Sequence, residues 1–326
     1  MNKVRIYACG GTGITLGSRF DQREPQGALA GTETVYVDTS RSNLPPQLKD
    51  DANAYILKNL DGSGKIRADN SAPIVKSIGE LVLAHRPAAF NIVIFGTAGG
   101  SGSVFGPLLV KHLLDNDHPV VCIAIGALDS EITARNTLNT LKTLDSLRAA
   151  AQAPLIMHYQ QNPLDAPRTE VDNNAIATIQ LLLLLASGKN NGLDTRDVRN
   201  FLRYDLACGV PPSLACLEVF CGNDLEQIQE SGVKHCLSLA TIHQSQDFVP
   251  LRLRSSYQCE GFRPADAQLD EQVPGDVHFL VHTDDVEAIV ASIKKVTEEY
   301  EELKRLVAPP SAVARPGEAD DNGLIL

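Results

Sequence analysis

Short apolar runs alternate with longer mixed segments through the first half of the chain. The runs lie at residues 4–8, 33–38, 90–96, 118–126 and 153–159. Runs of this length, separated by segments long enough to form helices, are typical of strands buried on both faces of a parallel sheet. The first half of the chain therefore predicts an α/β domain with a parallel, doubly wound sheet.

The pattern changes after residue 160. A polar stretch at 160–174 leads into residues 175–188, which are apolar on nearly every side of a helix. A helix of that kind is buried between two layers of structure. We therefore expect a central helix that joins the first domain to a second unit.

The second half predicts a smaller α/β unit. Strands are expected at 234–242, 248–256 and 276–283, and an amphipathic helix at 284–306. The remaining residues are rich in Pro and Ala, then acidic, then apolar, which is typical of a flexible end. The predicted segments are a first domain at 1–168, the central helix at 169–189, a loop and a C-terminal domain at 190–306, and an acidic tail at 307–326.

Composition narrows the class of protein. With 326 residues, 43% of them hydrophobic, the chain can bury a substantial core, and its longest apolar run, at 175–186, is too short to span a bilayer. Seven scattered cysteines without a CxxC pair fit neither a disulfide framework nor a zinc knuckle. The net charge of -11 opposes direct binding to nucleic acid, which requires clustered Lys and Arg. We expect a cytoplasmic protein with no membrane partner, and any link to DNA would need an adaptor.

A glycine-rich loop follows the first expected strand. Gly10, Gly11 and Gly13 would let backbone N–H groups approach a diphosphate at the start of a helix. The loop nearly matches the dinucleotide fingerprint, but Leu16 stands where that pattern has its third glycine. Asp38, at the end of the next strand, could contact a ribose in either kind of site. A Rossmann-type NAD-dependent oxidoreductase is therefore one alternative.

A second glycine-rich loop follows the strand at 90–96. Gly99, Gly100 and Gly102 flank Ser101, and a helix is expected from about Ser103. Two phosphate-binding loops on neighbouring strands could surround the phosphates of one nucleotide from two sides, whereas a single Rossmann unit has no use for the second. The alternative is that these glycines only permit tight turns.

A third loop, at residues 61–70, superficially suggests a Walker motif through Gly64 and Lys65. The residue after the lysine is Ile66, so the hydroxyl that binds Mg²⁺ is missing. We interpret this segment as a mobile loop that approaches a terminal phosphate.

The order of these pieces resembles the tubulin/FtsZ superfamily. Its glycine-rich signature after the fourth strand corresponds to AGGSGSV at 98–104, with Ser101 in place of the usual Thr and Val104 in place of the last Gly. Together with the segments at 126–147, 190–205 and 318–326, this run is most similar to the phage-encoded tubulins of large bacteriophages. The resemblance extends in order along essentially the whole chain. It implies a GTP-binding domain at 1–168.

The resemblance also implies a set of nucleotide contacts. The first loop would hold phosphates, the loop after the second strand would line the site, the third loop would sense the γ-phosphate, and the loop after the fourth strand would form the main phosphate cradle. The next loop would contact the ribose, and the head of the central helix would bind guanine. The implied residues are Gly10, Gly11, Thr12, Gly13, Asp38, Thr39, Gly62, Ser63, Gly64, Ala98, Gly99, Gly100, Ser101, Gly102, Ser103, Asp129, Ser130, Asp172 and Asn173.

For the last two residues a simpler interpretation stays open. Asp172 and Asn173 stand where relatives recognise guanine with an Asn-Asp pair, in the reverse order. An amide or carboxylate there could pair with the edge of guanine that adenine lacks. Asp and Asn are also ordinary N-cap residues of helices.

Two acids follow the central helix. Asp194 and Asp197 are three residues apart, which favours an N-cap and a first-turn acid of one short helix. By resemblance, this loop enters the nucleotide site of the next subunit and its acids activate water, with Gly192 in place of the usual Asn. Hydrolysis would then occur in trans, with Mg²⁺ bridging phosphate oxygens of GTP, although the sequence assigns no metal ligand.

Contacts of this kind are head-to-tail and generate filaments of identical subunits. The implied protein is a cytoskeletal GTPase that positions phage DNA or its compartment in the host cytoplasm, through a possible adaptor. A structural relative that does not hydrolyse GTP is a second alternative. In the acidic tail, the residues expected to grip the neighbouring subunit are Asp320, Asp321, Leu324, Ile325 and Leu326.

Overall fold

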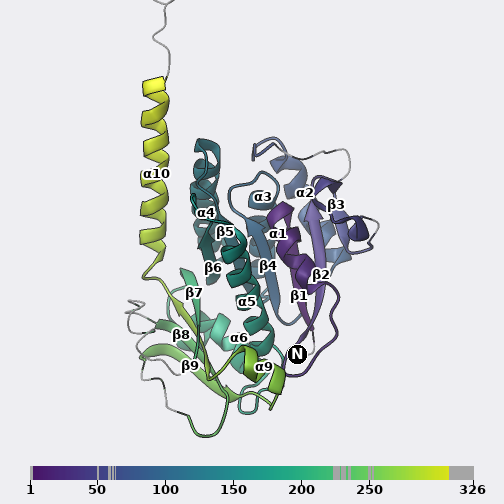
Figure 1. Ribbon diagram of the computed structural model, residues 1–326, viewed down its shortest axis with the longest axis vertical. Coiled ribbons are helices and arrows are strands. Elements are labelled where there is room, and N and C mark those ends of the chain that lie inside the picture. Colours follow the sequence, from purple (N-terminus) through teal and green to yellow (C-terminus); the bar gives the residue numbers. More distant parts are fainter. Residues whose placement is uncertain are drawn as a thin grey trace, which may run out of the picture.

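The computed structural model describes residues 3–49, 51–57, 60, 62, 64–222, 228, 233, 236–248, 251 and 253–307. Within these residues a single sheet runs through the molecule in the strand order β3-β2-β1-β4-β5-β6-β7-β10-β8-β9 (Figure 1). Its strands are β1 Lys3–Cys9, β2 Gly31–Asp38, β3 Ala54–Ile56, β4 Asn91–Gly96, β5 Val120–Gly126, β6 Leu155–Gln161, β7 Leu214–Cys221, β8 Cys236–His243, β9 Ser255–Phe262 and β10 Val277–His282.

Strands β1 to β7 are all parallel, and only β10 runs antiparallel to its neighbours β7 and β8. The α-helices among the described residues are α1 Gly10–Gly17, α2 Ser71–Ala84, α3 Gly102–Asp115, α4 Glu131–Ala151, α5 Thr169–Leu185, α6 Thr195–Leu202, α7 Tyr204–Cys208, α9 Ala267–Gln272 and α10 Val286–Val307. None of these helices has the length and apolar character needed to cross a membrane.

Helices cover both faces of the sheet. On β4, Ile92 and Ile94 join a hydrophobic cluster with α5 and α6, whereas Val93 and Phe95 join another with α2, α3 and α4. Successive residues of a strand point to opposite faces, so a strand buried on both sides must be apolar throughout. The prediction of a doubly wound parallel sheet in the first half is confirmed.

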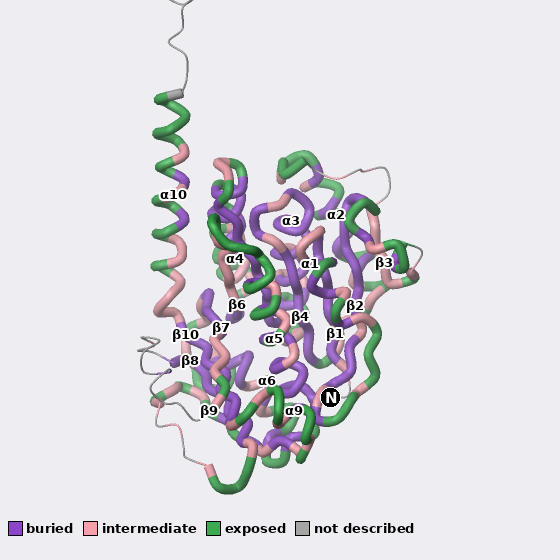
Figure 2. The backbone as a smooth tube through the Cα atoms, viewed as in Figure 1, coloured by how far each residue is buried: buried purple, intermediate pink, exposed green. Residues whose placement is uncertain are grey.

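Helix α5 is the buried helix that the sequence predicted. Leu181 to Leu185 are all buried, and they belong to the hydrophobic cluster that also contains residues of β1, β4, α6 and β10. Figure 2 shows this continuity of burial between the two halves of the molecule, in contrast to the more exposed α10.

One predicted strand in the second half is wrong. Of the strand expected at 248–256, residues 249, 250 and 252 lie outside the described residues, and only Ser255 and Ser256 are in a strand, β9, which runs to Phe262 on the edge of the sheet. Along it, Cys259 and Gly261 are buried while Gln258 and Glu260 are exposed. An edge strand with one solvated face lacks a continuous apolar run. A search for apolar runs therefore predicted this strand too early in the sequence. Strands β3 and β7 were not predicted, whereas β8, β10 and α10 confirm the expected elements.

We predict that Leu182→Ala lowers the free energy of unfolding by about 2–5 kcal/mol, because it removes buried methyl groups and leaves a cavity in the core. Leu206→Ala is the matched control, since that side chain is 66% exposed. It should change the free energy of unfolding by less than about 0.5 kcal/mol. Equilibrium denaturation of the two variants gives the comparison, and equal values would contradict the central place of α5 in the core.

Candidate functional site

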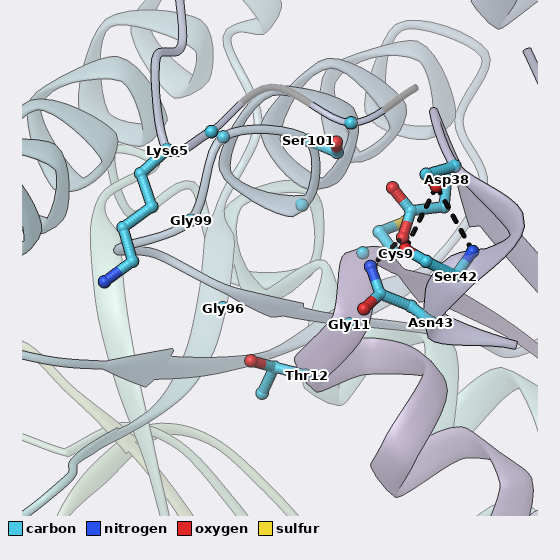
Figure 3. Close-up of a pocket in the computed structure, with 16 residues that line it drawn as sticks. Cys9, Gly11, Thr12, Asp38, Ser42, Asn43, Lys65, Gly96, Gly99 and Ser101 are labelled. Carbon is cyan, nitrogen blue, oxygen red and sulfur yellow. Dashed lines mark hydrogen bonds between the residues drawn. The ribbon is translucent and has the colours of Figure 1, made fainter. Parts of the chain in front are cut away.

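A cavity of about 320 Å³ lies at the carboxyl ends of β1, β2 and β4. In a parallel sheet the carboxyl ends of the strands lie on the same side, where each strand is followed by a loop and the N-terminus of a helix. Figure 3 shows Thr12, Asp38, Lys65 and Ser101 around this cavity. Its lining residues are Cys9, Gly10, Gly11, Thr12, Asp38, Ser40, Ser42, Asn43, Gly62, Gly64, Lys65, Gly96, Gly99, Gly100, Ser101 and Gly102.

The two glycine loops touch each other at this cavity. A Cβ atom on Gly10 would lie 2.7 Å from the backbone nitrogen of Gly102, and a Cβ on Gly102 would lie 2.7 Å from the carbonyl oxygen of Cys9. Gly10 also has a φ of +70°, in the left-handed region that favours glycine. Both positions therefore need glycine to bring the loops together. The interpretation that each loop only makes its own turn is insufficient.

The second loop is held by its own side chains. Ser103 donates a hydrogen bond from its Oγ to the carbonyl oxygen of Gly99 at 2.5 Å, and the hydroxyls of Ser101 and Thr39 lie 2.6 Å apart. Gly99 faces open space, since a Cβ there would meet no atom within 4 Å. The loop thus presents backbone and the N-terminus of α3 to the cavity, an arrangement that attracts anions. Thr39 follows β2, Ala98 lies in the second loop, Gly13 lies in α1 and Ser103 lies in α3, and none of these four residues lines the cavity.

Asp38 lines the cavity beside the second loop and is 1% exposed. Its Oδ2 accepts a hydrogen bond from Asn43 Nδ2 at 2.7 Å, and its Oδ1 accepts one from the backbone N–H of Thr39. The loop that follows β2 contributes Ser40, Ser42 and Asn43 to the lining. Sequence reasoning missed these three residues, although the polar run after an apolar strand was a signal for them.

The loop at 61–70 reaches the cavity through Gly62, Gly64 and Lys65. Asn136 of α4 donates from Nδ2 to the carbonyl oxygens of Lys65, at 2.8 Å, and of Ala98, at 3.0 Å, so it connects this loop to the phosphate cradle. Lys65 is the cation among the described lining residues. The sequence singled it out only as part of a failed Walker pattern. Ser63 lies outside the described residues.

Asp129 and Ser130 stand beside the cavity and do not line it. Ser130 is the N-cap of α4, and its side chain accepts a hydrogen bond from the backbone N–H of Thr133. Asp129 forms an ion pair with Arg168 at 3.5 Å. A hydrogen bond with Thr133 lowers the pKa of Asp129, and the charges of Lys65 and Arg168 lower it further.

Asp172 and Asn173 lie on α5, away from this cavity. Asn173 lines a separate cavity with Arg19 and Phe20, just beyond the end of α1. The interpretation that the pair caps a helix is wrong, because α5 begins at Thr169 with Arg168 as its N-cap. Both residues therefore lie inside the first turns of the helix, where a cap cannot be their role.

Asp194 and Asp197 form a reciprocal cap at the start of α6. Oδ1 of Asp194 accepts hydrogen bonds from the backbone N–H groups of Arg196 and Asp197, and Oδ2 of Asp197 accepts one from the N–H of Asp194 at 3.0 Å. These backbone bonds hold the pKa of Asp194 below its usual value, the bond from Asp197 contributing most. Helix α6 packs near β8 and β9, far from the glycine loops (Figure 1). The structure does not bring the two acids to the cavity of their own chain.

The expected polymer contacts Asp320, Asp321, Leu324, Ile325 and Leu326 lie outside the described residues. Gly192, which stands where the resemblance expects Asn, has a φ of +82°. The local backbone conformation therefore explains why this position is a glycine.

Comparison with known proteins shows which sequences this chain resembles. No family model matches the chain. A phage tubulin-like protein of Pseudomonas phage phiKZ is 29% identical over 256 residues, which is 75% of both chains, and one of Pseudomonas phage PhiPA3 is 32% identical over 203 residues, 62% of this chain and 61% of the relative.

Solved structures agree in fold. The protofilament of TubZ from bacteriophage PhiKZ has a TM-score of 0.85 and 26% identity, and it covers 99% of both chains. The phage tubulin PhuZ bound to GDP has a TM-score of 0.84 and 21% identity over the same share. In sequence and in fold this chain is therefore similar to phage tubulin-like proteins, as the sequence resemblance implied.

Proposed function

We propose that the protein binds GTP in the cavity between the glycine loops, polymerises head-to-tail into filaments and hydrolyses GTP at the contact between subunits. The observation that carries this proposal is the contact between Gly10 and Gly102, which makes one site of two phosphate-binding loops. The relatives add to it, since one solved structure is a protofilament and another is bound to GDP. An NAD site would leave the second loop without a role.

The cavity suits a polyphosphate chemically. Backbone N–H groups at the N-termini of α1 and α3 would donate to phosphate oxygens, and the aligned peptide dipoles would favour their charge. Lys65 adds a positive charge from a third direction. Since the lining residues provide little else that is charged, binding would depend mainly on the backbone.

The cavity also offers oxygen ligands for Mg²⁺. The Asp38 carboxylate and the hydroxyls of Thr12 and Ser42 line it, and oxygen ligands are what Mg²⁺ prefers. When bound, the ion would neutralise charge on the phosphate oxygens.

The guanine base would extend along α1. This helix has eight residues, so it is about 12 Å long from the phosphate loop to its end. Asn173 lies beside Arg19 and Phe20, just past that end. Asp172 and Asn173 are therefore our proposed guanine contacts, and Asp129 and Ser130 the proposed ribose contacts.

Asp194 and Asp197 would act on the nucleotide of a neighbouring subunit. Asp194 is exposed at the end of the molecule that carries α6, whereas the cavity opens where α3 begins. Head-to-tail stacking would bring these ends together, so that the acids orient the attacking water while one subunit alone stays nearly inactive. Such filaments would position phage DNA or its compartment in the host cytoplasm through an adaptor.

We predict that the protein sediments as polymer with GTP and much less with GDP.

Gly99→Val should lower affinity for GTP roughly tenfold or more, equivalent to at least ~1.4 kcal/mol, because its side chain would occupy the cavity without meeting other protein atoms. Gly79→Ala, also in open space but on α2, is the control and should bind and sediment as the unmodified protein does. A folded Gly99→Val protein with unchanged GTP affinity would show that the nucleotide binds elsewhere.

We also predict that Asp194→Asn slows GTP hydrolysis by roughly 100-fold, as for loss of a group that orients the attacking water. Asn is as good an N-cap as Asp, so α6 and polymerisation should persist and the filaments should outlast those of the unmodified protein. The control is Asp266→Asn, which alters the capping acid of α9. If Asp194→Asn filaments release phosphate at the rate of the unmodified protein, Asp194 serves only as the N-cap of α6.

Deletion of residues 314–326 is expected to raise the critical concentration for assembly while GTP binding by the monomer is unchanged. A tethered acidic segment adds affinity through effective concentration, and its contribution weakens as salt screens it. Sedimentation at low and high salt provides the measurement. The same threshold for the shortened and full-length chains at both salt concentrations would leave the tail without a role in assembly.

A further inference from the structure

Three potential metal ligands gather where α10 leaves the sheet. They are Glu218 of β7, His282 at the end of β10, and Asp285, the residue before α10, and their ligand atoms all lie within 4.8 Å of one another. His282 Nε2 and Glu218 Oε2 are 3.7 Å apart. Two ligands about 2.1 Å from a tetrahedral zinc ion lie roughly 3.4 Å apart, so small side-chain rotations would complete such a site.

His282 is the unusual member of this cluster. Its side chain is 0% exposed, and neither ring nitrogen has a hydrogen-bond partner in the part of the chain that the structure describes. The Oε2 atom of Glu218 is also buried without a hydrogen-bond partner there. A buried polar group left unpaired is unfavourable, so each such group needs an explanation.

A second buried histidine shows what a satisfied arrangement looks like. His243 of β8 also lies between two carboxylates, but its Nδ1 is 2.8 Å from Asp276 and its Nε2 is 3.1 Å from Glu260. Both ring nitrogens are thus engaged, and the acids lie on opposite sides of the ring. Around His282 the two acids instead converge with an unengaged ring, and this leaves room for a cation among them.

The charges point the same way. Glu218 and Asp285 are two carboxylates close together in a partly buried site, where like charges repel each other. A divalent cation would relieve that repulsion and give the imidazole a partner.

We propose that Glu218, His282 and Asp285 bind one divalent metal ion, and that the ion is Zn²⁺. One imidazole nitrogen with two carboxylate oxygens is a ligand set that zinc accepts, with water in the remaining position. Mg²⁺ and Ca²⁺ bind oxygen ligands and have no use for the imidazole. The ion would tie β7 and β10 to the residue that precedes α10, and so fix the direction in which this helix leaves the sheet.

The test uses the untagged, full-length protein, freed of nucleotide and treated with a chelator. Zn²⁺ titrated in competition with a chromogenic chelator should bind at one ion per chain and raise the melting temperature, whereas Mg²⁺ at the same concentration should not. A folded protein that does not compete for Zn²⁺ would overturn the proposal.

Isosteric variants identify the ligands. Glu218→Gln and Asp285→Asn should each lower Zn²⁺ affinity at least about tenfold and abolish the rise in melting temperature, as is usual when a metal loses one carboxylate ligand. Glu260→Gln, beside His243, is the matched control and should leave Zn²⁺ affinity unchanged. Cys208 and Cys221 are exposed thiols that could also bind zinc. Equal affinity in all three variants and the unmodified protein would assign the binding to such thiols and refute the site.

Discussion

The close approach of two backbone segments, one after β1 and one after β4, is the constraint on which the candidate site depends. The Cα of Gly102 and the carbonyl of Cys9 are so near that neither Gly10 nor Gly102 has space for a side chain. This contact aligns the N-termini of α1 and α3 on one cavity. Anions gain from both helix ends at once, which neither loop could provide alone. The adjacent loops, with Asp38 and Lys65, then determine what else can bind.

A second constraint is the separation of the proposed site into two ends of one molecule. The buried helix α5 runs between them, with Asp172 and Asn173 near its start and Asp194 shortly after its end. Its leucines belong to a cluster shared by both halves of the sheet, so the two ends are held at a fixed distance. A rigid body with complementary halves of a site at opposite ends can complete that site only with another copy. Such a contact does not close on itself, which is the geometry of a filament.

The sequence was informative where one local pattern decided the structure. Alternating apolar runs located the parallel strands β1, β2, β4, β5 and β6, the run of leucines located α5, and the two glycine clusters located the cavity. It was less informative where a residue's role depends on distant neighbours. Lys65 reaches the cavity because Asn136, 71 residues away in the chain, holds its carbonyl oxygen, and no local motif predicts that bond.

The edge strand β9 was misplaced for a related reason, since its exposed face carries polar residues such as Gln258 and Glu260. The pair at Asp172 and Asn173 looked like a helix cap, but helix α5 begins earlier in the chain than these residues. In both cases the sequence pattern was correctly described and the tertiary context changed its meaning.

The cluster at Glu218, His282 and Asp285 extends this argument. Glu218 and His282 are 64 positions apart in the sequence and come together only because β10 pairs with β7. A buried imidazole without a hydrogen-bond partner is unfavourable unless a ligand satisfies it. At the glycine loops, the absence of side chains is explained by the backbone that each glycine meets. By the same reasoning, polar atoms that converge without satisfying one another are explained by a ligand that satisfies them all. A cation there would act at the base of α10, the helix that leads to the acidic tail, and would thus connect the rigid sheet to the segment proposed to grip the next subunit.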